Sequence, residues 1–152
     1  MPHAAANTAS ADLDRKVSDL YDRILIVDLI THIGVILDEG RFDNLRSVFT
    51  EDVVVRFGFP GVEPIDTVAA LMACRHRPQR AYHLFTDHLI ELSGDRAQAR
   101  ASLTGVHVRR DEAPGAQFDI GAHYRFEMVR TTDGWRISRM TTEAAGTAGV
   151  AS

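Results

Sequence analysis

Cysteine, metal-ligand spacings and long hydrophobic runs are all scarce in this sequence. The chain of 152 residues contains a single cysteine, Cys74, so no intrachain disulfide can form and the fold needs no oxidising compartment. It has no Cys-x-x-Cys pair and no Cys/His spacing of the zinc-site kind, so the sequence predicts no metal. The most apolar stretch, Ile24 to Leu37, covers about 14 residues and includes Asp28 and His32, which makes it too short and too polar to cross a bilayer.

The chain also lacks a strong charge bias and a targeting signal. Its formal net charge is −4, and 45% hydrophobic with 25% charged residues is typical of a soluble globular protein. No Lys/Arg cluster is interleaved with aromatic residues, so we expect no nucleic-acid partner. The first ten residues have neither the basic start nor the apolar stretch of a signal peptide, so we expect a cytoplasmic protein with no membrane partner.

Both ends of the chain have little apolar surface to bury. Residues 1–11 are rich in Ala, Asn, Thr and Ser, and residues 144–152 are rich in Ala, Gly and Thr, which predicts two disordered tails. Residues 12–143 show neither an internal repeat nor a linker, and their number suits one ordinary domain.

Helical patterns come first in the chain and strand patterns follow. Asp12 or Asp14 can cap a long helix that ends near Glu39, before Gly40. The remaining expected elements are helices at Asn44–Phe49 and Thr67–His76 and strands at Val53–Phe59, His83–Leu92, Arg96–Arg109, Gln117–Arg130 and Trp135–Thr142. Helices followed by an antiparallel meander indicate an α+β fold whose sheet buries one face on the helices.

Strand alternation predicts which polar side chains point inward. His107 shares a strand face with the apolar residues Ala101 and Leu103, so it points into the core. The inward face of the next strand carries Phe118, Ile120, Ala122, Tyr124, Phe126 and Met128. Arg139 shares a face with Trp135, so it is either a cation inside a pocket or a side chain that reaches the rim. The facing of His83, at the start of its strand, is ambiguous from alternation alone.

Three segments carry a family resemblance: DRILIVDLITHIGVILDEGRFDNLRSVFTEDVVV (22–55), YHLFTDHLIELSGDRAQARASLTGVHV (82–108) and GAHYRFEMVRTTDGWRISRM (121–140). In this order and spacing the chain resembles the SnoaL-like branch of the nuclear transport factor 2-like superfamily. The resemblance implies a cone-shaped α+β barrel, in which a strongly curved antiparallel sheet wraps around a long N-terminal helix and two shorter helices. It also implies an apolar pocket and a homodimer formed through the outer face of the sheet, where Ser102, Thr104 and Val106 would lie.

The resemblance also implies a set of site residues. In relatives such as scytalone dehydratase and bile acid 7α-dehydratase, a catalytic histidine matches His83 and a supporting aspartate matches Asp38. A second histidine falls close to His107, and an arginine matches Arg139. The pocket is expected to include Ile33, Phe57, Leu103, Tyr124 and Trp135.

This residue set suits proton transfer. A neutral imidazole in an apolar cone, oriented by a carboxylate, is a general base near neutral pH. A second histidine or an arginine can stabilise the resulting oxyanion. We therefore expect a cofactor-independent lyase, isomerase or cyclase acting on a small apolar or polycyclic molecule.

The departures from the family pattern keep a second hypothesis open. The tyrosine that relatives often carry one helical turn before the aspartate is Ile33 here, and a first-strand tyrosine of scytalone dehydratase is Phe57. The loss of these phenols favours a module that only binds a small ligand or assembles with a partner, as in the small subunits of ring-hydroxylating dioxygenases. In that hypothesis Asp38 has a structural role and bonds to nearby backbone or to Arg41.

Overall fold

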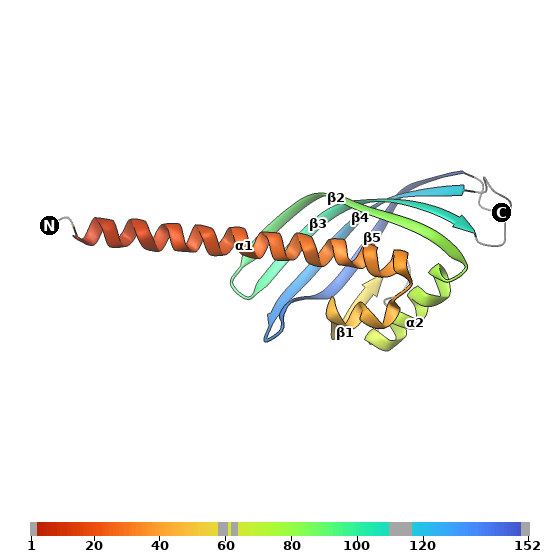
Figure 1. The fold of residues 1–152 in the computed structure, drawn as a ribbon, viewed down its shortest axis with the longest axis horizontal. Helices are drawn as coiled ribbons and strands as arrows, with labels where there is room; N and C mark the ends of the chain where they lie inside the picture. The colour runs from red at the N-terminus through yellow and green to blue at the C-terminus, as the bar shows by residue number, and fades with distance from the viewer. Residues whose placement is uncertain (1–2, 58–60, 62–63, 110–116, 150–152) are drawn as a thin grey trace.

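The fold is a curved sheet closed on its concave side by helices. In the computed structural model, which describes residues 3–57, 61, 64–109 and 117–149, the elements in chain order are α1 (His3–Glu39), the 3₁₀ helix η1 (Phe42–Ser47), β1 (Phe49–Arg56), α2 (Ile65–His76), β2 (Gln79–Ser93), β3 (Arg96–Arg109), β4 (Gln117–Thr131) and β5 (Gly134–Gly149). The strands form one sheet in the order β1-β5-β4-β3-β2 (Figure 1). Strands β2 to β5 are an antiparallel meander, and β1 adds to β5 in parallel.

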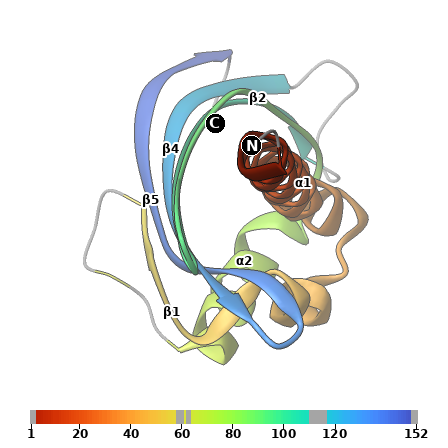
Figure 2. The same cartoon turned by 90° about the vertical axis from the view of Figure 1, so that its left-hand side faces the viewer.

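The long helix α1 lies along the concave face of the sheet, which curls around it (Figure 2). Ile26, Ile30, Ile33 and Ile36 recur at helical spacing on one face and are almost completely buried. They pack with Phe85 and Phe126 of the sheet in a single hydrophobic cluster. The α+β class, the long helix and the curved sheet are therefore as predicted. None of the helices in the described part of the chain combines the length and hydrophobicity needed to span a bilayer.

Regular structure runs further into both ends of the chain than composition predicts. Helix α1 begins at His3 rather than at a cap on Asp12 or Asp14. Strand β5 continues to Gly149 because its last residues pair with β4, for example Gly121 with Gly146. Backbone pairing with a neighbouring strand orders a segment that has few apolar side chains of its own. The loops expected near Pro60 and over 111–115, and the side chain of Phe118, lie outside the described residues.

Two β-bulges decide which side chains reach the concave face. In β2 an extra residue between Thr86 and Leu89 shifts the register, and Asp87 adopts a positive φ of 55° there. His83 and Phe85, before the bulge, therefore point inward, whereas Leu89, after it, is exposed.

The second bulge lies in β5 and overturns one expectation from alternation. Glu127 pairs with Arg139 but Met128 pairs with Ile137, so Ser138 is the extra residue. As a result Met140, which is buried, takes the inward position that alternation had assigned to Arg139. In β3 the alternation holds throughout, and Ala101, Leu103 and His107 are all buried.

Candidate functional site

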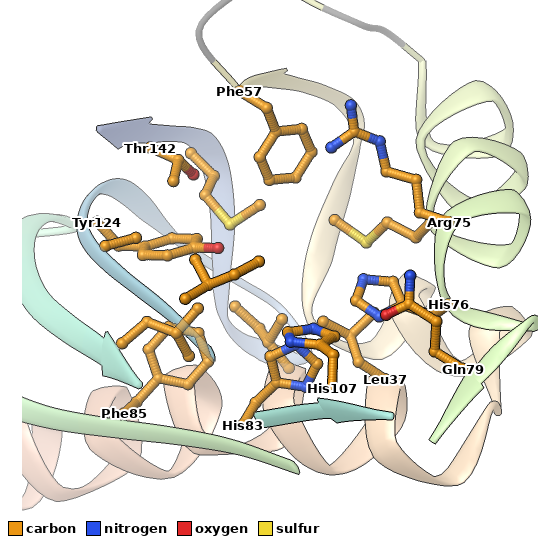
Figure 3. Close-up of a pocket in the computed structure, with 16 residues that line it drawn as sticks. Leu37, Phe57, Arg75, His76, Gln79, His83, Phe85, His107, Tyr124 and Thr142 are labelled. Carbon is orange, nitrogen blue, oxygen red and sulfur yellow. The ribbon is translucent and has the colours of Figure 1, made fainter. Parts of the chain in front are cut away.

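A cavity of about 490 Å³ lies between the C-terminal half of α1, α2 and the concave face of the sheet (Figure 3). Its wall is mainly apolar and includes Ile33, Leu37, Phe57, Met72, Phe85 and Leu103. The polar side chains in the wall are Arg75, His76, Gln79, His83, His107, Tyr124 and Thr142. This size and this mixture of many apolar and a few polar groups are those of a small-molecule site.

Asp38 and His83 form the central contact of the site. Asp38 Oδ1 lies 2.6 Å from His83 Nδ1, and the backbone N–H of His83 donates to Asp38 Oδ2 over 3.1 Å. The His83 side chain is only 4% exposed. Arg41, the other partner considered for Asp38, pairs with Glu39 instead. Because a carboxylate can only accept a hydrogen bond, the contact at Nδ1 selects the tautomer of the neutral ring that has its proton on Nδ1 and its lone pair on Nε2.

His107 and His76 complete a cluster of three imidazoles. The ring centre of His83 lies 5.0 Å from that of His107 and 5.1 Å from that of His76, and the other two centres are 6.0 Å apart. Burial is the main cause that lowers the pKa of His76 to about 4, with the charges of its neighbours acting in the same direction. Burial also lowers the pKa of His107. Both rings are therefore neutral at neutral pH.

The structure thus adds His76 to the residues predicted from sequence. His76 lies in the last turn of α2, and nothing in a short helix of mixed composition indicates which face turns toward the sheet. A histidine near the C-terminal end of a helix, just before Pro78, is equally typical of a residue that stabilises the helix terminus. Only the packing of α2 against η1, β1 and β2 brings its ring beside His83.

Tyr124 and Arg75 provide further polar groups on the other sides of the cavity (Figure 3). The Tyr124 ring packs edge-on against Phe85 with centres 5.3 Å apart. Burial raises the pKa of the Tyr124 phenol, and the Thr142 hydroxyl partly offsets this rise. Arg75 holds its guanidinium 5.5 Å from the centre of the Phe57 ring. The cavity therefore contains a phenol even though the two family tyrosine positions are Ile33 and Phe57.

Two residues that sequence reasoning assigned to the site lie elsewhere. Arg139 is outside the cavity wall, where its Nε lies 3.4 Å from Glu127 Oε1, because of the bulge at Ser138. Trp135 is 3% exposed but packs away from the cavity, and its indole Nε1 donates to Asp22 over 3.0 Å. The other expected wall residues, Ile33, Phe57, Leu103 and Tyr124, do line the cavity.

Comparison with known proteins agrees with this architecture. The SnoaL-like domain matches residues 18–141. An uncharacterised protein of Mycobacterium tuberculosis is 30% identical over 136 residues, which cover 85% of this chain and 91% of that protein. A scytalone dehydratase-like protein from Novosphingobium aromaticivorans superimposes with a TM-score of 0.81 at 18% identity, covering 90% of this chain and 93% of the other. A hexachlorocyclohexane dehydrochlorinase from Novosphingobium barchaimii gives a TM-score of 0.75 at 20% identity, with coverages of 92% and 94%. The last two likenesses establish a shared fold.

Proposed function

The chain belongs to the SnoaL-like domain family, and on that premise we propose that it is a cofactor-independent lyase, isomerase or cyclase that works by proton transfer. The observation that carries the proposal is the 2.6 Å contact between Asp38 and His83 at the wall of a largely apolar cavity. Asp38 orients the ring and stabilises the imidazolium that forms when His83 accepts a proton.

In the proposed reaction Nε2 of His83 removes a proton from the carbon next to a carbonyl group. The electron pair of the C–H bond moves into the carbonyl to give an enolate. A neutral donor, either His107 beside the base or the phenol of Tyr124 elsewhere in the cavity wall, hydrogen-bonds the enolate oxygen. The imidazolium of His83 then returns its proton, either to a different carbon, which is isomerisation, or to a leaving hydroxyl, which departs as water.

The cavity supports an apolar or polycyclic carbonyl compound as substrate. Its wall presents aromatic and aliphatic surface from Phe57, Phe85 and Leu103. Of the described residues in the wall, Arg75 is the one with a permanent positive charge. A volume near 490 Å³ lies in the range of about 300–1,000 Å³ that is usual for small-molecule pockets. The competing binding-module hypothesis needs the same cavity but no proton transfer, so a test must measure the proton-transfer step itself.

The step can be measured without knowing the leaving group. A bicyclic ketone such as 2-tetralone is incubated with the protein in D₂O, and exchange of its α-protons is followed by NMR. We expect His83→Ala to lower the exchange rate by about 10²–10⁴, the usual loss for a general base, and Asp38→Asn to lower it by as much or less. Arg139→Ala is the matched control and should keep the rate. Ligand binding with no protein-dependent exchange would favour the binding module, and normal exchange in a folded His83→Ala protein would rule out this base.

A further inference from the structure

We propose that His76, His83 and His107 form a binding site for a divalent transition-metal ion of the zinc, cobalt and nickel class. This goes beyond the proposed reaction, which needs no metal. One ring nitrogen from each of the three histidines lies within 4.8 Å of those of the other two. The residues come from α2, β2 and β3, so three separate elements converge on one point of the cavity wall (Figure 3).

Two of the rings each have a nitrogen that could bind a shared ion. Nδ1 of His83 is held by Asp38, so Nε2 is the nitrogen left to bind a metal. A carboxylate behind a ligating histidine is the outer-shell arrangement that fixes imidazole ligands in zinc sites. Nδ1 of His76 is buried and makes no hydrogen bond to the described residues. A buried imidazole nitrogen normally has a partner, and a metal ion would supply one.

The backbone beside the cluster leaves room for the rings. A Cβ at Gly105 would lie 2.8 Å from Cε1 of His107 and 3.5 Å from Cδ2 of His83. Gly105 is therefore the residue that lets two imidazoles pack over strand β3. Zinc held tetrahedrally at a Zn–N distance of 2.1 Å needs ligand nitrogens about 3.4 Å apart. The ligand nitrogens now lie within 4.8 Å of one another. Modest rotations of the three histidine side chains would bring them to the spacing that zinc needs.

The ligand chemistry narrows the choice of ion. Three imidazoles without a thiolate suit zinc, cobalt, nickel or copper, whereas magnesium and calcium prefer oxygen ligands. Three protein ligands leave a coordination position open toward the cavity. An ion at Nε2 of His83 occupies the lone pair that the proposed base uses, so metal binding and proton abstraction by His83 exclude each other.

Metal titration tests the site directly. Tag-free protein is stripped with a chelator, dialysed, and titrated with Co²⁺ while its visible d–d absorption is recorded; Zn²⁺ binding is measured by calorimetry. We expect one ion per chain with a dissociation constant at or below the micromolar range and no uptake of Mg²⁺. His76→Ala should weaken binding by at least about 10- to 100-fold, and Asp38→Asn should weaken it within the 10- to 100-fold range of an outer-shell change.

The control is His123→Ala, because His123 is exposed on the opposite face of β4. This variant should bind Co²⁺ like the wild type. His76→Gln keeps most of the side-chain volume and serves if His76→Ala does not fold. The proposal is overturned if the wild type takes up no ion, if His76→Ala and His76→Gln bind as tightly as the wild type, or if His123→Ala abolishes binding. None of these outcomes bears on α-proton exchange measured on the metal-free protein. The metal site and the proposed general base can therefore be refuted independently of each other.

Discussion

Gly34 of α1 lies directly against His83 of β2. A Cβ at Gly34 would be 3.1 Å from the carbonyl oxygen of His83 and 3.3 Å from its Cβ. The glycine thus allows the helix to approach the strand closely enough for Asp38, one turn further on, to reach the imidazole. Helix α1 therefore positions the candidate base as well as filling the core.

We expect Gly34→Ala to slow α-proton exchange strongly while changing the thermal stability only a little. Alanine favours a helix over glycine by about 1 kcal/mol, which offsets part of the strain of moving α1 away from β2. The backbone atoms of His83 cannot rotate aside, so Asp38 moves relative to the ring, and misplacement of this kind costs about 10- to 100-fold in rate. Exchange and thermal unfolding are measured on the same preparation. His32→Ala, at an exposed position of the same helix, should change neither, and an unaltered rate in Gly34→Ala would contradict this role.

Folding stability should fall as the pH drops from about 6.5 toward 4. The pKa of His76 is about 4 in the folded protein against 6.5 ordinarily, so in this range the unfolded chain binds a proton that the folded protein does not. The contribution of the neutral ring is complete above about pH 6.5, and its loss by pH 4 is on the order of 3 kcal/mol. Burial lowers the pKa of His107 and His88 too, which adds in the same direction.

Urea unfolding at several pH values, with a chelator present, measures this dependence. His76→Gln should flatten the curve between pH 4 and 6.5, whereas His123→Gln should leave its slope unchanged because His123 is exposed. Equal slopes for wild type and His76→Gln would mean that His76 titrates normally in the folded protein.

The local pattern of the sequence predicts much of the fold but less of the site. Strict alternation along β3 places His107 inward, and the structure agrees. Arg139 and Trp135 were misplaced for different reasons. A one-residue bulge at Ser138 turns Arg139 outward, and a partner distant in sequence, Asp22, holds Trp135 away from the cavity. Neither a bulge nor a long-range hydrogen bond leaves a periodic signal, and the contribution of His76 depends on how α2 docks.

The hydrogen bonds of Asp22 tie the β4–β5 hairpin to α1. The nearly buried carboxylate accepts bonds of 2.9 and 2.7 Å from Arg130 and one of 3.0 Å from Trp135. The Arg130 guanidinium also lies 4.4 Å from the centre of the Trp135 ring. These bonds lower the pKa of Asp22. The network stabilises the ionised carboxylate and satisfies the buried indole N–H.

Removing the Asp22 carboxylate should lower the free energy of unfolding without altering the cavity, because Asp22 does not line it. Asp22→Ala leaves the buried indole N–H without its acceptor, whereas the Arg130 guanidinium keeps its exposed partner Asp95, so we expect a cost of about 1–3 kcal/mol. Trp135 is the only tryptophan, so its fluorescence reports urea unfolding and its own change of environment. Asp19→Ala, at an exposed position of α1, should cost less than about 0.5 kcal/mol. A similarly small effect of Asp22→Ala would show that the network is dispensable.

Two exposed apolar surfaces offer sites for self-association. On the convex face of the sheet, Tyr82 is 61% and Leu84 46% exposed, and Tyr82 pairs with Val106 of β3. The other surface is a stripe on the part of α1 that extends beyond the sheet (Figure 1), where Leu13, Val17, Leu20 and Ile24 recur at the 4-3-4 spacing of packed helices. Monomers rarely expose contiguous apolar surface of this kind.

We expect a homodimer that forms through the convex face of the sheet. The face combines aromatic and aliphatic side chains with the neutral polar Ser102 and Thr104, a mixture that suits the centre of an interface between identical subunits. Sedimentation velocity at micromolar concentration should show a dimer for the wild type. Leu84→Asp places an unpaired charge in that interface, so its dimer should be weaker by about 2 kcal/mol or more, roughly 30-fold in dissociation constant. Leu20→Asp on α1 is the matched control and should remain dimeric; a monomeric Leu20→Asp beside a dimeric Leu84→Asp would place the interface on α1 instead.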